Sequence, residues 1–148
     1  MSVLTLDRVR IHPAGASRDE ALKEAADILV AAGAVTTDYL QAMHDREKSV
    51  STYMGNGLAI PHGTNDAKDA VLGSALSVVR YDGGVDWDGE RATFVIGIAG
   101  KDGEHLEILS QIAILFSDED DVAKLNAAAT PEELFELLSA VNEGANEA

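Results

Sequence analysis

Two nearly continuous apolar segments, residues 71–81 and 91–99, constrain the fold of this chain more than any other feature. Both are rich in residues that favour strands, and neither alternates strictly between apolar and polar side chains. Because strict alternation is typical of a sheet with one face in water, its absence favours a sheet covered on each side by helices. The sequence Asp82-Gly83-Gly84 predicts a turn after the first segment. Trp87 lies in the acidic loop that follows and is expected to pack on a strand edge.

Five segments have the capping signals or the apolar spacing of helices. They cover residues 17–33, 36–48, 104–116, 118–129 and 130 onward. Ser17 and Glu20 match a capping box, in which the serine hydroxyl accepts from the glutamate amide and the carboxylate reaches back to the serine amide. Thr36 is the expected N-cap of the second helix, and Thr130 followed by Pro131 starts the last one.

Two shorter apolar segments and a polar loop complete the expected order of the elements. Residues 3–11 and 58–60 predict shorter strands, and a polar loop at 49–56 precedes the second of these. The order is thus one strand, two helices, three strands and three helices, in a chain about one domain long. This order favours a layered α/β or α+β sandwich. The third helix is expected to bury Leu106, Leu109, Ile112, Ala113 and Phe116.

Charge and composition limit the classes of partner. The chain has 26 acidic and 11 basic residues, a formal charge of −15, and no cysteine. A phosphate backbone or an anionic membrane would be repelled, so nucleic acid is not an expected partner. A basic protein partner is the natural complement, although acidity that serves only solubility explains the charge equally well. Without cysteine, the chain has no disulfide, thiolate metal site or cysteine nucleophile.

Several other classes find no support in the sequence. No apolar stretch reaches the roughly 18 residues of a membrane helix, and the first residues lack the apolar core of a signal peptide. We therefore expect a soluble cytoplasmic protein that does not insert into a membrane. Glycine-rich nucleotide-binding motifs are also lacking.

His62 is the candidate functional residue with the most constrained surroundings. It follows the apolar run 58–60 and lies between Pro61 and Gly63. Pro61 fixes its own φ and biases Ile60 toward an extended conformation, so the imidazole is expected to leave a stiff support at a strand end. Gly63 would let a large group approach the ring. A histidine in such a place is more often an ordinary polar residue, so this segment alone does not establish catalysis.

Two other residues suggest phosphoryl transfer. A histidine acts as a nucleophile when one ring nitrogen is unprotonated and the other is held by an acceptor. Phosphoryl transfer then needs alignment and positive groups near the phosphoryl oxygens. Arg46 stands at the end of the second helix, within the charged run 44–48, which is otherwise expected to be a solvated face. His105 is in the first turn of the third helix, where helical amides favour an anion.

These segments resemble a known family. They are Asp45-Arg46-Glu47-Lys48, Ser51-Thr52-Tyr53-Met54-Gly55, Leu58-Ala59-Ile60-Pro61-His62-Gly63-Thr64 and Glu104-His105-Leu106. Together they are similar to the active-site signature of the mannitol/fructose-type IIA component of the bacterial phosphoenolpyruvate-dependent sugar phosphotransferase system. The segment Thr52-Tyr53-Met54-Gly55 and Gly63-Thr64 favour the mannitol branch. Asn56 departs from the mannitol pattern, in which an acidic residue is common.

The resemblance implies a fold, partners and roles. It implies a single domain over residues 1–148, an α/β or α+β-like sandwich with a mixed β-sheet flanked by helices, and a flexible tail from about 142. His62 would accept a phosphoryl group from the carrier protein HPr and pass it to a cysteine of a separate IIB domain. His105 and Arg46 would stabilise the phosphoryl oxygens, and no cofactor or metal is implied. Leu58 and Ile60, or their neighbours, would line the docking face.

Three alternatives remain open at this point. The chain resembles fructose-type IIA components as well as the mannitol branch. A regulatory IIA would report its phosphorylation state without feeding transport. A non-enzymatic binding module would use the histidines only to shape a pocket.

Overall fold

The computed structural model describes residues 3–63, 69–101 and 104–139, without the side chains of Glu104 and His105. Its sheet has the order β1-β4-β5-β3-β2. These strands are β1 (Val9–His12), β2 (Tyr53–Gly55), β3 (Leu58–Ala59), β4 (Ala75–Trp87) and β5 (Glu90–Ala99). The pairs β1–β4 and β3–β5 are parallel, whereas β4–β5 and β2–β3 are antiparallel. The expected mixed sheet is therefore confirmed.

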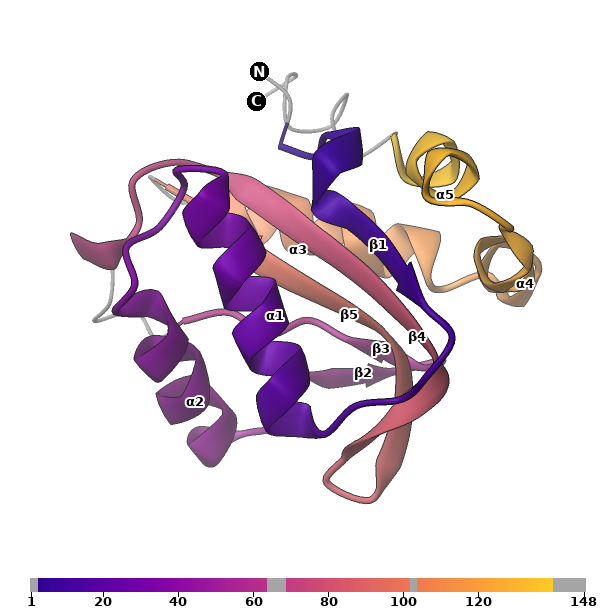
Figure 1. Ribbon diagram of the computed structural model, residues 1–148, viewed down its shortest axis with the longest axis horizontal. Helices are drawn as coiled ribbons and strands as arrows, with labels where there is room; N and C mark the ends of the chain where they lie inside the picture. The colour runs from indigo at the N-terminus through magenta and orange to yellow at the C-terminus, as the bar shows by residue number, and fades with distance from the viewer. Residues whose placement is uncertain (1–2, 64–68, 102–103, 140–148) are drawn as a thin grey trace.

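Helices cover both faces of this sheet (Figure 1). They are α1 (Arg18–Ala31), α2 (Tyr39–Ser49), α3 (Glu104–Leu115), α4 (Glu119–Ala127) and α5 (Pro131–Leu138). On one face α1 and α2 pack against a core that includes Val79 and Val95 of the sheet. On the other, the C-terminal helices cover a second core that includes Phe94 and Ile96. Successive residues of β5 thus enter opposite cores, which explains why this segment does not alternate.

The helix starts that depend on local sequence are confirmed. In the capping box of α1, the Glu20 amide donates to the Ser17 hydroxyl and the Ser17 amide donates to the Glu20 carboxylate, both at 3.1 Å. The hydroxyl of Thr130 accepts from the amide of Glu133 at 3.2 Å, and Pro131 is the first residue of α5. Residues 140–148, which include the predicted tail from about 142, lie outside the described residues.

The predicted cap at Thr36 is wrong. Helix α2 begins at Tyr39, and its N-cap Asp38 makes no side-chain capping bond. The amide of Thr36 donates to the carbonyl oxygen of Ala70 at 2.8 Å, so this residue is tied to the segment before β4. Its hydroxyl is buried without a hydrogen-bond partner among the described residues. The Thr36 hydroxyl therefore caps none of the described helical amides.

The predicted turn at residues 82–84 is also wrong. Strand β4 continues through these residues to Trp87, with a register shift between Arg80 and Val85. The loop after β1 lies against this irregular stretch, where the amide of Ala16 donates to the carbonyl oxygen of Gly84 at 3.3 Å. Trp87 is consequently the last residue of β4 and is fully buried, rather than part of a loop.

Three smaller expectations are corrected. The predicted strand 3–11 is reduced to β1, because a 3-10 turn (Leu6–Arg8) precedes Val9. The loop predicted at 49–56 contains the short strand β2. Helix α3 buries Ile108 and Ile112, and Phe116 directly after it is buried too, whereas Leu106 is 63% exposed and Ala113 is also exposed. The face of α3 that meets the sheet is therefore rotated from the predicted one.

Candidate functional site

His62 lies just after β3, alongside the end of β5. Its backbone forms a parallel bridge with Ile98, whose amide donates to the carbonyl oxygen of Pro61 at 3.0 Å. Nδ1 of the His62 ring lies 2.8 Å from the carbonyl oxygen of Ile60. A carbonyl oxygen only accepts, so Nδ1 carries the proton in this contact and the lone pair of the neutral ring is on Nε2. The predicted stiff support at a strand end is thus present.

Tyr39, the first residue of α2, holds the chain on the other side of His62. Its hydroxyl donates to the carbonyl oxygen of Ile98 at 2.7 Å and accepts from the amide of Gly63 at 2.9 Å. Burial raises the pKa of this hydroxyl, although the bond from the Gly63 amide acts in the opposite direction. A Cβ at Gly63 would lie 2.6 Å from Cε1 of Tyr39, so the large group that uses this space is the tyrosine ring. Sequence reasoning missed this role of Tyr39.

Arg46 lies in the last turn of α2. Its Nη1 donates to the carbonyl oxygen of Val50 at 2.5 Å, which holds the start of the following loop. The next residue, Glu47, is buried instead of belonging to a solvated face. The Glu47 carboxylate accepts from the amide and hydroxyl of Thr52 and from Nε1 of Trp87. Sequence reasoning missed these contacts because their donors come from different elements.

His105 occupies the first turn of α3, as predicted from the sequence. Its side chain lies outside the described part of the structure, so only its backbone is placed. Leu58 and Ile60, expected to line a docking face, are both buried. The exposed apolar residues on neighbouring segments include Val50 and Met54, before and in β2, and Leu106 and Ile114 of α3.

Asn56 stands in the tight connection between β2 and β3. Its φ of 52° is in the left-handed region, which asparagine tolerates better than most residues. Its side-chain amide donates to the carbonyl oxygen of Phe116 at 2.7 Å. An ionised carboxylate cannot donate this bond, so the departure from the mannitol pattern has a structural use here.

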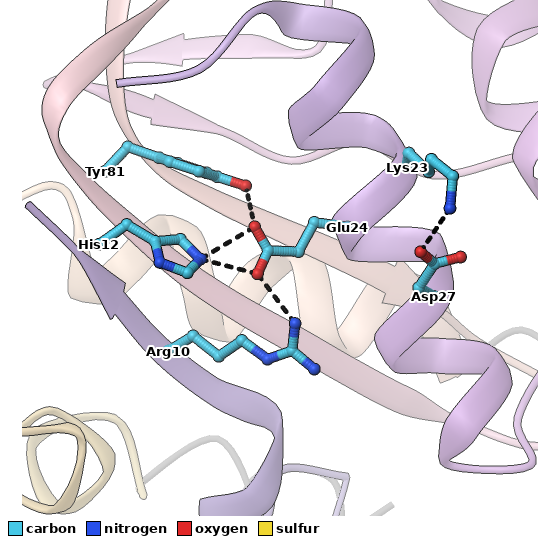
Figure 2. A network of polar contacts seen from close by, with 6 residues as sticks. All are labelled: Arg10, His12, Lys23, Glu24, Asp27 and Tyr81. Atoms are coloured by element: carbon cyan, nitrogen blue, oxygen red, sulfur yellow. Dashed lines mark hydrogen bonds and ion pairs between the residues drawn. The ribbon is translucent and has the colours of Figure 1, made fainter. Parts of the chain in front are cut away.

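A second polar cluster lies on the far side of β4 from β5. The side chains of Tyr81, His12 and Arg10 converge on the carboxylate of Glu24 (Figure 2), at 2.5, 2.8 and 2.9 Å. Burial raises the pKa of Glu24, but the hydrogen bonds from Tyr81, His12 and Arg10 outweigh it and leave the pKa below its usual value. A groove of about 460 Å³ opens beside this cluster, and its described lining includes none of the three candidate site residues.

Comparison with known proteins decides the family. The family model described as "Phosphoenolpyruvate-dependent sugar phosphotransferase system, EIIA 2" matches residues 2–141. The chain belongs to the EIIA 2 family. Members of this family are phosphotransferases, and the resemblance seen in the sequence is confirmed.

Three relatives of this EIIA 2 chain show the extent of the similarity. It is 56% identical over 122 residues to the mannitol-specific phosphotransferase enzyme IIA component of Staphylococcus aureus, covering 82% of this chain and 85% of the relative. The Bacillus subtilis component of the same description is 43% identical over 143 residues, covering 96% of this chain and all of the relative. A solved complex of enzyme IIA mannitol with phosphorylated enzyme IIB, from Escherichia coli, matches with a TM-score of 0.85 and 35% identity, covering 93% and 97% of the two chains.

Membrane and metal features were searched over residues 3–63, 69–101 and 104–139. No helix there has the length and apolar composition needed to cross a membrane. Nor do His, Asp and Glu side chains in these ranges form a group of three that could hold a metal ion.

Proposed function

We propose that this chain is the phosphocarrier of a mannitol-type phosphotransferase system, with His62 as the residue that carries the phosphoryl group. The single observation that carries the proposal is the contact of Nδ1 with the carbonyl oxygen of Ile60, which puts the lone pair on Nε2. The mannitol-specific names of the Staphylococcus aureus and Bacillus subtilis relatives support the branch. The Escherichia coli complex supports a IIB domain as the acceptor.

The proposed reaction consists of two displacements at phosphorus. The Nε2 lone pair of His62 attacks the phosphorus of phosphorylated HPr, and the P–N bond to the HPr histidine breaks with its electron pair returning to that ring. A cysteine thiolate of the separate IIB chain then attacks the same phosphorus, and the electron pair of the breaking P–N bond returns to Nε2 of His62. The protein mainly supplies alignment and positive groups for these steps. The cytoplasm is the proposed location, as the sequence predicts.

Arg46 and His105 are proposed to stabilise the phosphoryl oxygens. The guanidinium of Arg46 is a permanent cation in a protein of formal charge −15, and a bound anion requires such local compensation. His105 belongs to the first turn of α3, whose amides form the positive end of the helix. No cofactor or metal has a part in this scheme.

Phosphorylation with purified HPr tests the proposal. Wild-type protein incubated with phosphorylated HPr should gain an acid-labile, base-stable phosphoryl group on the peptide that covers residues 49–68, detected by mass spectrometry. His62→Ala should abolish it, whereas the control His12→Ala should keep it. Arg46→Ala and His105→Ala should each slow transfer by about 10², while Arg18→Ala at an exposed ion pair should not.

The outcomes also separate the alternatives. A binding module would take up no phosphoryl group in any variant. A regulatory IIA would be phosphorylated on His62 but would not pass the group to a mannitol-type IIB domain, and a fructose-type IIA would prefer a fructose-type IIB. Unchanged transfer rates in Arg46→Ala and His105→Ala would reduce these residues to scaffolding.

A further inference from the structure

We propose that Glu47 is a positioning residue for the imidazole of His62, acting through Thr52 and Ile60. This inference rests on the proposed function of His62. Glu47 follows Arg46 on α2 and has no place in the phosphoryl-transfer scheme above. Its carboxylate is nevertheless buried, with the residue only 6% exposed. Burial of a carboxylate costs free energy unless the carboxylate is fully hydrogen-bonded. The fold must therefore keep the donors to Glu47 in place.

The donors to Glu47 come from two other segments. Oε2 accepts from the amide of Thr52 and from Nε1 of Trp87, both at 3.2 Å. Oε1 accepts from the hydroxyl of Thr52. Thr52 and Trp87 are themselves buried, so these bonds are shielded from water. The carboxylate therefore joins α2 to the segment before β2 and to the end of β4.

A continuous series of hydrogen bonds runs from this carboxylate to the catalytic ring. The amide of Thr52 donates to the Glu47 carboxylate, and the carbonyl oxygen of Thr52 accepts from the amide of Ile60 at 3.1 Å. The carbonyl oxygen of Ile60 in turn accepts from Nδ1 of His62 at 2.8 Å. Loss of the Glu47 carboxylate would release Thr52 and, through it, the carbonyl group that orients the imidazole.

The orientation matters because it fixes the tautomer. A histidine in water favours the neutral tautomer with its proton on Nε2, the nitrogen that must supply the lone pair in the proposed reaction. The Ile60 carbonyl oxygen reverses this preference by accepting from Nδ1. Glu47 is thus expected to affect both the geometry of attack and the fraction of His62 in the reactive tautomer, without touching the phosphoryl group.

Four variants separate positioning from charge and from folding. Glu47→Ala removes all three acceptor contacts. Glu47→Gln preserves them, because the amide oxygen can accept from the Thr52 amide and Trp87 while the amide nitrogen donates to the Thr52 hydroxyl. Thr52→Val removes only the hydroxyl contact at nearly constant shape. Glu136→Ala removes an exposed glutamate from α5 and serves as the control.

Two measurements are made on each variant: the rate of phosphorylation by phosphorylated HPr, and the ¹⁵N chemical shifts of the His62 ring, which report where its proton lies. Glu47→Ala should slow transfer by about 10–100-fold, the size expected for a small misplacement of a reacting group, and should move the proton toward Nε2. Thr52→Val should shift both quantities in the same direction by less. Glu47→Gln and Glu136→Ala should resemble the wild type.

Several results would overturn the proposal. One is a folded Glu47→Ala protein with wild-type rate and wild-type ring shifts; another is a Glu47→Gln protein as impaired as Glu47→Ala. If Glu47→Ala does not fold, unchanged rate and shifts in Thr52→Val decide against the proposal. The ring shifts need no HPr, so altered shifts in Glu47→Ala together with an unphosphorylated wild-type protein would refute the proposed function and support the positioning of the imidazole.

Discussion

Tyr39 is expected to stabilise the fold and the candidate site through one hydroxyl group. Tyr39→Phe leaves the buried carbonyl group of Ile98 and the amide of Gly63 without this partner. We expect the free energy of unfolding to fall by about 1–3 kcal/mol, as measured by urea denaturation, and phosphorylation of His62 to slow. Tyr53→Phe is the control, because its hydroxyl makes weaker, more exposed contacts and should cost less. Equal stability of Tyr39→Phe and wild type would contradict the role.

Individual residues were predictable where their chemistry is carried by a local motif. A constrained histidine is predicted from three adjacent residues, Pro61, His62 and Gly63. In the structure, Nδ1 of that ring lies 2.8 Å from the carbonyl oxygen of Ile60. The charged neighbours of Glu47 in the sequence predict a solvated face, whereas the residue is buried. Its partner Trp87 is 40 residues away, and no local pattern encodes that contact.

At the scale of elements, the long strand β4 depends on a close approach of two backbones. A Cβ at Gly83 would lie 2.3 Å from the nitrogen of Gly15 and 2.7 Å from the carbonyl carbon of Ala14. Neither is the end of a flexible side chain, so Gly83→Ala must displace backbone. We expect a loss of about 1–3 kcal/mol in unfolding free energy, measured by thermal or urea unfolding.

Gly73→Ala is the matched control for this prediction. A Cβ there would meet no atom within 4 Å, and the residue does not have a positive φ. Its stability should stay within about 0.5 kcal/mol of wild type or rise slightly. If the two alanine variants prove equally stable, the contact between the loop after β1 and β4 does not constrain the fold.

The contact between the loop after β1 and β4 shows why some elements could be predicted from the sequence and others could not. Helices α1 and α5 have their capping residues within four positions of their start, and both starts were predicted correctly. Residues 82–84 have the composition of a turn, yet they continue β4 because a loop from residues 13–16 lies against them. The misplaced face of α3 has a similar cause, since its rotation is set by the sheet that it covers.

At the scale of the whole molecule, the two-sided burial of the strands predicted the layered architecture. The order of the strands was not predictable in the same way. Placing β1 in parallel beside β4 pairs Val9 with Val78, and these residues are 69 positions apart. Such pairing is decided by how both cores fill, and no single segment carries that information.

The Glu24 cluster joins three elements of the molecule and should make its stability depend on pH. Glu24 of α1 binds Arg10 and His12 of β1 and Tyr81 of β4. Burial raises the pKa of Glu24, but these hydrogen bonds lower it more, so the folded protein holds this proton less tightly than the unfolded chain. The stabilisation is therefore complete above the unfolded pKa of about 4.3 and is lost as the pH falls through the lower folded pKa.

Glu24→Gln tests this dependence. At pH 7 the variant should unfold about 1–2 kcal/mol more easily than wild type, because the hydrogen bonds to a charged acceptor are lost. The difference should shrink below about pH 4, where the wild-type carboxylate takes up its proton. Urea denaturation of both proteins from pH 7 down to about pH 3 measures the effect, and Glu136→Gln on the exposed face of α5 controls for the change in net charge. If the difference in unfolding free energy between wild type and Glu24→Gln stays constant down to the lowest pH measured, packing around Glu24 holds β1, β4 and α1 together, and its ionisation does not.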